Sequence, residues 1–342
     1  MSGCSRSRFR VALTLTASVF LTGGVAVPAR AQTAATRPDF TVTVSSFGFD
    51  TSPTIQAAVD KVIRHGGGTL RLEPGLYPVQ RAVFVTNAKD VCITGYGATI
   101  RAARHMTTTS DGDLIRIQDS DRVTITGIAF NGDASSRAFT GSPQSVRLNW
   151  SRDVLIADCS FKNAVCDDIF MWGGLNPATA DRICHRIQIT HCVFDNANRN
   201  AISVVNAANV QIDHNLFENV RHNEPQAGID VEPNYGDPPG AARRILIDHN
   251  RLVNCGYGIT TKQVDRPTDI WIIANSVEHC RYGIGNEAAN CDIEWNIISY
   301  SEAFAIAAGS GGSGKIQNNT ADHCGAGIFA DPPHKIRSNI IK

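Results

Sequence analysis

An isoleucine-led phrase recurs through this chain and constrains its fold more than any other feature of the sequence. Its ten copies begin at residues 93, 125, 156, 189, 212, 247, 272, 293, 316 and 336, and the last six have asparagine at their fourth position. Copies separated by roughly 20 to 35 residues are typical of a solenoid built from one repeated unit. The runs are short, β-branched and rich in Asn and Gly, which predicts strands and excludes a helical solenoid.

The repeat predicts an all-β chain of parallel strands wound as a three-sided coil. Each rung then buries its inward residues on the rung below, about 4.8 Å away. Cys159 and Cys192 fall in one column and are interpreted as core residues, whereas Cys255 and Cys280 are expected to be stacked thiols, with a disulfide as the alternative. The asparagines of the phrase are expected to stack as an internal amide ladder. They are Asn215, Asn250, Asn275, Asn296, Asn319 and Asn339.

The first 31 residues have the pattern of a signal peptide. Arg6, Arg8 and Arg10 precede an apolar stretch over 11–27, and Ala-Arg-Ala at 29–31 has the small-x-small form of a cleavage site. A membrane anchor is the alternative, but Thr, Ser and Gly residues interrupt the stretch. We therefore expect a secreted or periplasmic protein with no membrane span.

The charge balance of the mature chain is slightly acidic. Removing residues 1–31 removes four arginines and no acidic residue, which leaves 28 basic against 32 acidic residues. There is no basic excess to indicate nucleic-acid binding. Ten cysteines become nine when Cys4 leaves with the signal, and an odd count argues against a complete disulfide framework.

A helical cap is predicted ahead of the repeats. Residues 54–65 form an amphipathic helical pattern after Ser52-Pro53. Three glycines at 66–68 end the helix, and a strand begins at Thr69 and leads to Pro74-Gly75. A short cap of this kind covers the open end of a solenoid.

This opening and the repeats together resemble the pectin-lyase-like superfamily over residues 40–342. The resemblance implies a right-handed parallel β-helix with a short N-terminal capping helix and a carbohydrate partner. It does not select a reaction, because one fold carries several chemistries. The expected parts are a signal peptide (1–31), an N-terminal leader segment (32–52) and a parallel β-helix domain (53–342).

A second phrase runs in phase with the first and is expected to form an exposed sheet. Strand alternation points the second and fourth residues of each copy outward. One outward column contains Arg116, Arg147, Phe170, Ser203, Asp230, Thr260 and Gly285. The other contains Gln118, Asn149, Trp172, Val205, Glu232, Lys262 and Glu287.

Asp230 and Glu232 lie two residues apart on this face, about 6.5–7 Å between Cα atoms. Two carboxyl groups at such a spacing can act as acid and base in glycoside hydrolysis. Phe170 and Trp172 are expected to stack on a sugar, because exposed aromatics beside acids are costly without a ligand. The alternative is an ion-pair surface in which Lys262 neutralises Glu232. The residues expected to contact the polymer are Arg147, Asn149, Asp168, Phe170, Trp172, Arg199 and Glu287, and His222 and Glu224 are expected to reach the same cleft.

A polygalacturonase-type site is matched only in part. The Asp167-Asp168 pair is present, but the position of that family's Gly-His-Gly reads Arg199-Asn200-Ala201, and no Arg-Ile-Lys occurs. The arrangement is closer to calcium-dependent lyases of uronate polymers. This resemblance implies Ca²⁺ as a cofactor held by Asn200, Asp230 and Glu232, with Lys262 as the base that removes the C5 proton.

Three histidines form a competing cluster. His191, His214 and His249 each precede the ladder residue and are expected to stack outward on three rungs. Three imidazoles can bind Zn²⁺, but solvated turn residues in a repeated phrase are the favoured interpretation.

The sequence therefore predicts an exported enzyme that cleaves a polysaccharide, as a lyase or a glycoside hydrolase. The polymer expected from the calcium-dependent resemblance contains uronate. The alternative function is that of a non-catalytic carbohydrate-binding or surface β-helix protein, which needs the aromatic residues but not both carboxylates.

Overall fold

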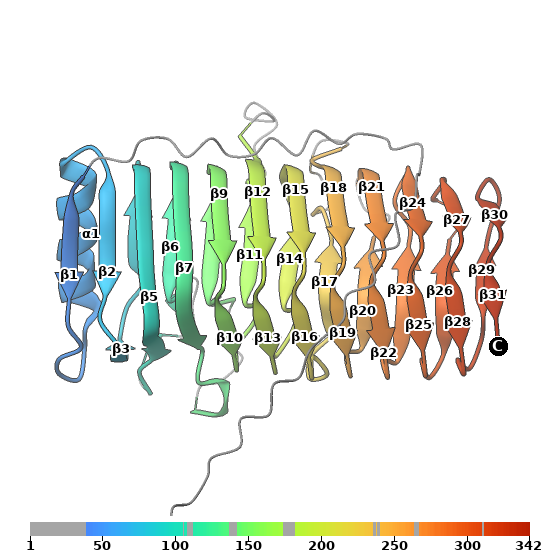
Figure 1. Cartoon of the computed structure of the whole chain (residues 1–342), viewed down its shortest axis with the longest axis horizontal. Coiled ribbons are helices and arrows are strands. Elements are labelled where there is room, and N and C mark those ends of the chain that lie inside the picture. The colour runs from blue at the N-terminus through green and yellow to red at the C-terminus, as the bar shows by residue number, and fades with distance from the viewer. Residues whose placement is uncertain are drawn as a thin grey trace, which may run out of the picture. The chain divides into compact units, whose positions relative to one another are not determined.

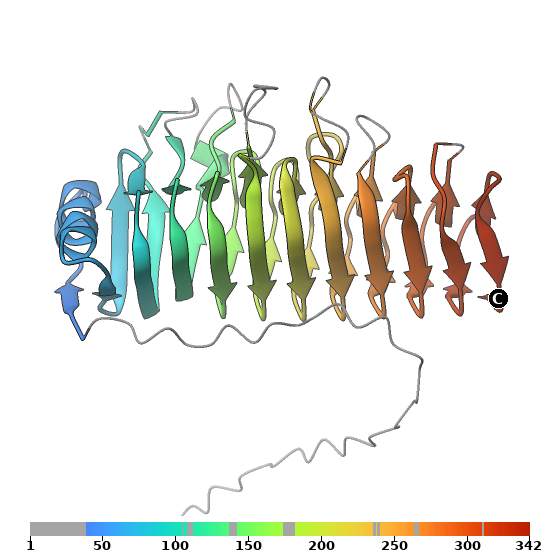
Figure 2. The ribbon, with the colours of Figure 1, turned by 90° about the horizontal axis from the view of Figure 1, so that it is seen from above.

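The computed structural model describes residues 39–104, 106–107, 112–136, 142–173, 182–234, 237, 240–262, 267–309 and 311–342. The predicted signal peptide and residues 32–38 of the leader lie outside these ranges. The described chain is a right-handed parallel β-helix whose strands stack rung upon rung along one axis (Figure 1, Figure 2). No helix within the described ranges is long and apolar enough to cross a membrane.

Helix α1 (Ser52–Arg64) forms the predicted cap and begins two residues earlier than expected (Figure 1). Proline stands in its first turn, where a missing N–H costs no hydrogen bond. Ile55, Val59 and Val62 are buried on its inner side. Gly68, which follows the helix, has a left-handed φ of 132°, and a Cβ there would lie 2.3 Å from the carbonyl oxygen of Phe40. Only glycine fits at this turn.

Part of the predicted leader belongs to the coil itself. Strand β1 (Thr41–Val44) pairs in parallel with β2 (Gly68–Leu72), so that Thr41 lies opposite Thr69. The β-helix therefore begins before residue 53, because β1 completes the first rung beside the capping helix.

Two parallel sheets make up the coil. In the 21-stranded sheet, β5 and β7 run through both sides, and each later rung contributes two shorter strands. One side contains β2, β5 (Lys89–Ala102), β7 (Asp121–Asn131), β9 (Arg152–Ala157), β12 (Cys184–Thr190), β15 (Ala207–Asp213), β18 (Ala242–Asp248), β21 (Thr268–Ile273), β24 (Cys291–Glu294), β27 (Lys315–Gln317) and β30 (Lys335–Arg337). The other contains β3 (Gly75–Val79), β10 (Ser160–Lys162), β13 (Val193–Asp195), β16 (Leu216–Glu218), β19 (Arg251–Val253), β22 (Ser276–Glu278), β25 (Ile297–Ser299), β28 (Thr320–Asp322) and β31 (Ile340–Ile341).

The ten-stranded sheet forms the remaining side of the coil and carries the candidate site. All its strands are parallel, and each pairs with the equivalent strand of the next rung. They are β4 (Val83–Thr86), β6 (Ile115–Gln118), β8 (Val146–Asn149), β11 (Ile169–Trp172), β14 (Ile202–Val204), β17 (Ala227–Val231), β20 (Tyr257–Thr261), β23 (Tyr282–Asn286), β26 (Phe304–Ala308) and β29 (Ile328–Ala330).

The predicted asparagine ladder is confirmed. Asn215 Nδ2 donates to Asn250 Oδ1 at 3.0 Å and to the carbonyl oxygen of Ile189 at 3.0 Å. The same pattern continues rung by rung to Asn339. His214, just before the ladder residue, has a left-handed φ of 54°, which turns the chain at this corner. The buried amides satisfy one another and the backbone, as buried polar groups require.

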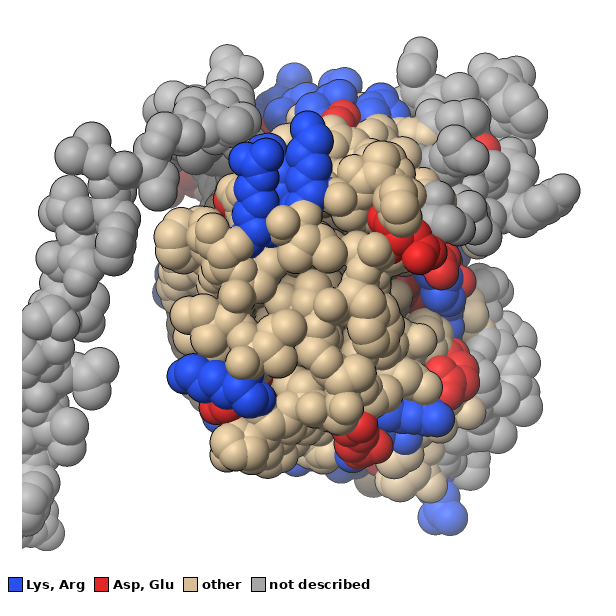
Figure 3. All heavy atoms as spheres, turned by 90° about the vertical axis from the view of Figure 1, so that its right-hand side faces the viewer, with Lys and Arg blue, Asp and Glu red and all other residues tan. Residues whose placement is uncertain are grey.

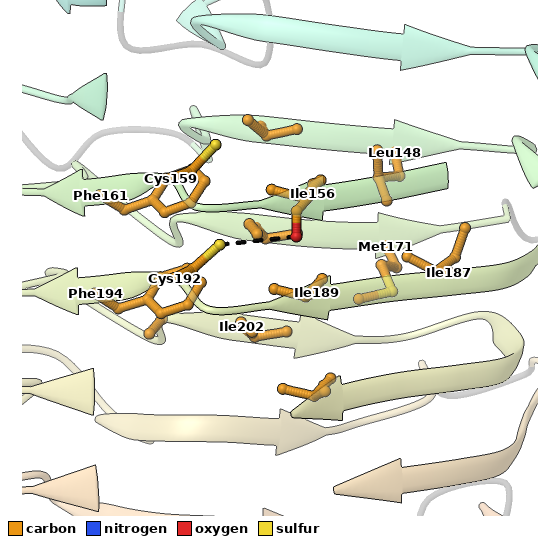
Figure 4. Close-up of a cluster of buried hydrophobic side chains, with 14 of the residues drawn as sticks. Leu148, Ile156, Cys159, Phe161, Met171, Ile187, Ile189, Cys192, Phe194 and Ile202 are labelled. Carbon is orange, nitrogen blue, oxygen red and sulfur yellow. Dashed lines mark hydrogen bonds between the residues drawn. The ribbon is translucent and has the colours of Figure 1, made fainter. Parts of the chain in front are cut away.

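Aliphatic side chains fill the interior together with stacked phenylalanine rings and cysteine thiols (Figure 4). Phe161 and Phe194 are nearly parallel, with ring centroids 4.8 Å apart. Cys159 and Cys192 lie in the same interior and are buried, as expected for core residues. All nine cysteines of the described chain are free, so Cys255 and Cys280 are the stacked thiols of the first expectation and not the disulfide.

The C-terminal end of the described coil is uncharged at its centre (Figure 3). Strands β29, β30 and β31 form the last rung, and their apolar side chains lie at the surface. Ile336, Ile340 and Ile341 are all exposed there. Lysine, arginine and acidic side chains surround this uncharged area (Figure 3).

Candidate functional site

The register of the ten-stranded sheet confirms both predicted outward columns. Parallel pairing places Asp230 opposite Ser203 on one side and Thr260 on the other. The first outer column, in register, is Phe84, Arg116, Arg147, Phe170, Ser203, Asp230, Thr260, Gly285, Ala307 and Phe329. The second outer column contains Gln118, Asn149 and Trp172, followed by Val205, Glu232, Lys262 and Glu287 at the ends of the next strands.

From β6 to β11 the outer face is filled by contacts among its own side chains. Arg116 and Arg147 both bind the buried Asp113 carboxylate, Arg116 Nη2 at 2.7 Å and Arg147 Nε at 2.8 Å from Oδ2. The Arg147 guanidinium also lies over the Phe170 ring, 5.1 Å from its centroid. Arg147 is only 7% exposed. This region therefore offers a ligand less positive charge and less aromatic surface than the sequence suggests.

Trp172 and Asn149 belong to the same filled region. Trp172 is half-buried and packs against Trp150, with ring centroids 5.8 Å apart. Asn149 is buried, and its Oδ1 has no hydrogen-bond partner among the described residues. Both side chains lie in the predicted column, but neighbouring side chains cover much of their surface.

Four charged side chains meet at the end of β17. Glu232 Oε2 accepts a hydrogen bond from Arg199 Nη2 at 2.7 Å, and Glu232 Oε1 accepts one from Lys262 Nζ at 2.6 Å. Lys262 Nζ also lies 4.0 Å from Asp230 Oδ2. The three residues predicted to be catalytic, Asp230, Glu232 and Lys262, are thus brought together, with Arg199 as the fourth member.

A buried layer holds this charged cluster in place and consists of Asp167, Asn200 and Ser203. Arg199 Nη1 donates to Asp167 Oδ2 at 3.1 Å, and Ser203 Oγ donates to the same oxygen at 2.9 Å. Asn200 Nδ2 donates to Ser203 Oγ and to Asp230 Oδ2, both at 3.0 Å. Burial raises the pKa of Asp167, although the Arg199 charge opposes this shift. These hydrogen bonds fix the positions of Arg199, in the turn before β14, and of Asp230, in β17.

Asp168, which was expected to contact the polymer, does not lie on the outer face. It is fully buried, and its Oδ1 accepts a hydrogen bond from Ser145 Oγ at 3.1 Å. At the equivalent position of a later rung, a Cβ on Gly228 would lie 2.6 Å from Leu252 Cδ2, in the core. This position therefore points into the coil, out of reach of a polymer on the outer face. Burial raises the pKa of Asp168 well above its usual value, despite the Ser145 hydrogen bond.

The Asp230 and Glu232 carboxyl groups are driven apart in pKa. Complete burial, followed by the charge of Glu232, raises the pKa of Asp230 well above its usual value, against the attraction of Lys262. Burial opposes ionisation of Glu232 as well, but a hydrogen bond from Asp230 and the charges of Lys262 and Arg199 outweigh it and lower the pKa of Glu232.

The opposite pKa shifts are those of two electrostatically coupled carboxyl groups, of which Asp230 favours its protonated form and Glu232 its ionised form. Asp230 Oδ1 has no hydrogen-bond donor among the described residues. Interacting carboxyls of this kind titrate as a unit, with one lowered and one raised pKa.

The donor set does not fit the calcium site implied by the sequence. Asn200 Oδ1 accepts the backbone N–H of Ala227 at 3.0 Å, and its amide nitrogen faces Asp230. Both oxygens of Glu232 are bound by cationic side chains. A Ca²⁺ ion needs six to eight oxygen ligands, and Arg199 and Lys262 would repel it. No step of the chemistry is therefore assigned to a metal here.

A groove of about 840 Å³ opens beside the charged cluster and continues over the last strands of the ten-stranded sheet. Its floor is the part of the first outer column with small side chains, Thr260, Gly285 and Ala307. Lys262 and Glu287, in the second outer column, line one side. Glu224 lines the groove as expected, whereas Arg147, Asn149, Phe170, Trp172 and His222 are not part of its described lining.

An aromatic row on the opposite side of the groove was missed by the sequence analysis. The rings of Tyr257 and Tyr282 stack with centroids 4.5 Å apart, and Tyr282 and Phe304 follow at 5.0 Å. Tyr257 and Phe304 line the groove, and Phe329 lies at its far end, 51% exposed. The signal was present in the sequence as Tyr-Gly-Ile at 257 and 282 and Phe-Ala-Ile at 304.

The histidines stack outward on three rungs, as expected. His191 and His214 have centroids 5.2 Å apart, and His214 and His249 lie 5.1 Å apart, with nearly parallel rings. Nδ1 of His214 pairs with Asp213 and Nδ1 of His249 with Asp248. This spacing is too wide for one Zn²⁺, whose ligand nitrogens lie about 2.0–2.1 Å from the metal. No group of three or more His, Cys, Asp or Glu in the described ranges is arranged for a metal.

A sequence-family model described as periplasmic copper-binding protein (NosD) matches residues 179–332, which is less than half of the chain. No curated protein sequence matches the chain. Among solved structures, an exopolygalacturonase from Thermotoga maritima is similar at 10% identity and a TM-score of 0.64, covering 90% of this chain and 92% of that chain. An endo-xylogalacturonan hydrolase from Aspergillus tubingensis has 13% identity and a TM-score of 0.64, with 89% and 93% covered.

The surface adhesin PfbA of Streptococcus pneumoniae is also similar, at 14% identity and a TM-score of 0.54, covering 88% of this chain and 90% of that chain. At these identities a structural likeness establishes the fold and not the activity. The chain shares the right-handed parallel β-helix fold of these solved structures.

Proposed function

We propose that this chain is an exported enzyme that cleaves glycosidic bonds in a polysaccharide, with Asp230 and Glu232 as a proton-sharing pair. The observation that carries the proposal is the position of this pair: Glu232 lines an open groove and binds Arg199 and Lys262, and Asp230 is buried beside it. The pKa values of the two carboxyl groups are shifted in opposite directions. Neighbouring carboxyls driven apart in pKa are typical of acid–base catalysis. Export is proposed from the signal-peptide pattern of residues 1–31.

Glu232 is the member of the pair that reaches the groove, while Asp230 is fully buried beside it. We assign the storage of the proton to Asp230 and its relay to Glu232: Glu232 takes the proton of Asp230 and gives a proton to the glycosidic oxygen as the bond from that oxygen to the anomeric carbon breaks. The negative charge left on the pair lies between Arg199 and Lys262, which stabilise it. Lys262 thus acts through its positive charge.

Glu287 is the proposed general base. It lines the groove in the same column as Glu232, two rungs further, which is about 10 Å along the sheet. Carboxyl groups of inverting glycosidases lie roughly 6.5–9.5 Å apart, a distance that two long side chains can reach. Water adds to the anomeric carbon and gives one proton to Glu287, while the leaving oxygen keeps the proton of the pair. The proposal is therefore hydrolysis with inversion.

Isosteric variants test this assignment. Asp230→Asn, Glu232→Gln and Glu287→Gln keep side-chain shape and are each expected to lower the rate by at least about 100-fold. Glu278→Gln is the matched control, because Glu278 is another arginine-paired glutamate with a lowered pKa, in β22 outside the groove. The purified chain is incubated with a panel of polysaccharides, and released reducing ends are measured together with the absorbance of unsaturated uronate.

Hydrolysis releases reducing ends without that absorbance, and chelation leaves the rate unchanged. Unsaturated products or full dependence on Ca²⁺ would contradict the hydrolytic assignment and favour the lyase expected from the sequence. Full activity of all three isosteric variants would exclude these carboxyls as the catalytic groups. A parent chain that binds polysaccharide and cleaves none of the panel would make the protein a carbohydrate-binding β-helix.

A further inference from the structure

We infer that the groove takes an uncharged glycan backbone and discriminates against uronate polymers. This inference rests on the proposed function and names its substrate class. It replaces the uronate-containing polymer expected from the sequence, because that expectation followed from a calcium site, and the oxygens of Asn200 and Glu232 that would bind the ion accept hydrogen bonds from nitrogen groups instead.

The charges of the groove oppose a polyanion. Its described lining has four acidic side chains, Glu224, Glu232, Glu287 and Asp331, and two basic ones, Arg199 and Lys262. Both basic side chains already bind Glu232, and Arg199 also binds Asp167.

Beyond Lys262, the described lining is charged only by Glu287 and Asp331. A uronate polymer carries one carboxylate on every sugar, and proteins recognise such groups with arginine forks or lysines. Each sugar placed on this stretch would bring its carboxylate toward an acidic side chain. Arg281 lies over the Tyr282 ring, 4.0 Å from Glu224, and is not part of the described lining.

The same stretch fits the apolar faces of sugar rings. Gly285 and Ala307 place no side chain larger than a methyl group on the floor, which leaves it flat between Tyr257 and Phe304. Phe329 meets Phe304 edge to face, with centroids 5.9 Å apart and an interplanar angle of 65°. Its ring is therefore not covered by the row, and half of the residue is exposed. An exposed aromatic at the end of a concave groove is typical of a binding site.

A neutral sugar offers hydrogen-bond donors to the acidic side chains of the groove. Carboxylates accept hydrogen bonds from hydroxyl groups and cannot donate them. Glu287 and Asp331 line the groove, and both are exposed to a ligand in it. A neutral glycan presents several hydroxyl donors on each ring, so acceptors along one side and apolar surface below match both of its features.

Binding measurements on a non-cleaving protein test the inference. Asp230→Asn is used, because it keeps Glu232 paired with Arg199 and Lys262, so that neither basic side chain becomes free to attract a uronate. Calorimetric titration compares neutral hexasaccharides (xylan, cellulose and mannan fragments) with hexagalacturonate and hexamannuronate, at low and moderate salt. We expect one neutral series to bind at least about tenfold more tightly than either uronate, with little salt dependence.

Two further variants locate the binding in the groove. Phe329→Ala is expected to weaken binding of the neutral hexasaccharide about tenfold. Its matched control is Phe84→Ala, in the same outer column at the other end of the sheet, where Arg116 covers the ring 5.3 Å from its centroid. The control should leave the affinity unchanged. Glu287→Lys combined with Asp331→Lys should raise the affinity for the uronates about tenfold.

Three outcomes would overturn the inference. These are uronates bound as tightly as any neutral glycan, no neutral glycan bound at all, or a loss equal in Phe84→Ala and Phe329→Ala. Cleavage of a uronate polymer that Asp230→Asn abolishes would overturn the inference and leave the proposed function standing. Neutral glycan bound through Phe329 without any cleavage by the parent would overturn the proposed function and leave this inference standing.

Discussion

The two halves of the outer face share one register and differ in what their side chains do to each other. From β6 to β11 the first outer column is Arg116, Arg147 and Phe170, and these long side chains cover one another and Asp113. From β20 to β26 the same column is Thr260, Gly285 and Ala307, and a groove of about 840 Å³ lies over them. Identical backbone geometry therefore gives a closed surface in one half and an open one in the other.

The charged cluster at Asp230 lies at the boundary between the two halves. Asp113 and Asp230 are both fully buried in the outer layer. Asp113 is bound by two arginines, whereas Asp230 has one lysine at 4.0 Å and an acidic neighbour. A buried carboxylate bound by two cations has a structural role. A buried carboxyl group with less compensating positive charge stays protonated and can act as a proton donor.

The largest effect is expected from the two aspartates, which should lose very different amounts of stability on the same change. Asp113→Asn leaves Arg116 and Arg147 without their anion, and the free energy of unfolding should fall by about 3 kcal/mol. Asp230→Asn replaces a carboxyl that favours its protonated form with a neutral group of the same shape, and should cost less than about 1 kcal/mol near neutral pH. Urea unfolding of both variants measures the difference, and equal losses would contradict it.

The two pKa shifts make the stability of Asp230→Asn relative to the parent depend on pH in a definite direction. The raised pKa of Asp230 contributes stability that is fully present below the unfolded value of about 3.9 and is lost as pH rises through the raised folded value. The lowered pKa of Glu232 contributes stability above about 4.3 that is lost as pH falls through the lowered value. Asp230→Asn should therefore gain in melting temperature relative to the parent as pH rises from about 5 to about 9. A constant difference would contradict the raised pKa.

The repeat, the ladder and the outward columns were predictable because each depends only on period and alternation. The asparagine of every rung must meet the asparagine of the next once the strands are parallel, so Asn215 to Asn339 followed from spacing alone. The same rule placed Asp230 and Glu232 on one face with Lys262 beside them. These predictions needed no knowledge of how a side chain is turned.

The features that the sequence pattern did not predict depend on contacts between side chains and on one local bend. Alternation points Asp230 outward but does not show that its neighbours bury it completely. The chain bends at Asp168, so this residue and Ile169 both face inward. Arg147 turns onto Phe170 and Asp113, which no strand pattern reveals. The groove arises where side chains are small, and small side chains give no signal in a strand pattern.

An intermediate effect, on glycan affinity, is expected when a large side chain fills the groove. Gly285→Arg puts into the groove the residue type that fills the same column at Arg116 and Arg147. Gly285 does not require a left-handed backbone, and a Cβ there would lie 3.3 Å from Tyr257 Cε1, a contact that a small shift relieves. Affinity for the neutral hexasaccharide should fall about 30-fold or more, while the melting temperature changes little. Calorimetry and melting curves check both, and unchanged binding would place the ligand elsewhere.

The smallest effect is expected from Trp172→Ala, which the sequence would rank among the largest. An exposed tryptophan beside two acids suggests a sugar platform, but the ring packs against Trp150 and belongs to the filled half. It is not part of the described groove lining, whereas Phe329 is. Glycan affinity and cleavage rate should therefore both stay within about threefold of the parent, and the free energy of unfolding should fall by about 1–2 kcal/mol from lost packing. A tenfold loss of affinity from Trp172→Ala on folded protein, with Phe329→Ala unaffected, would show that the polymer lies over β11 and that the filled half is the binding half.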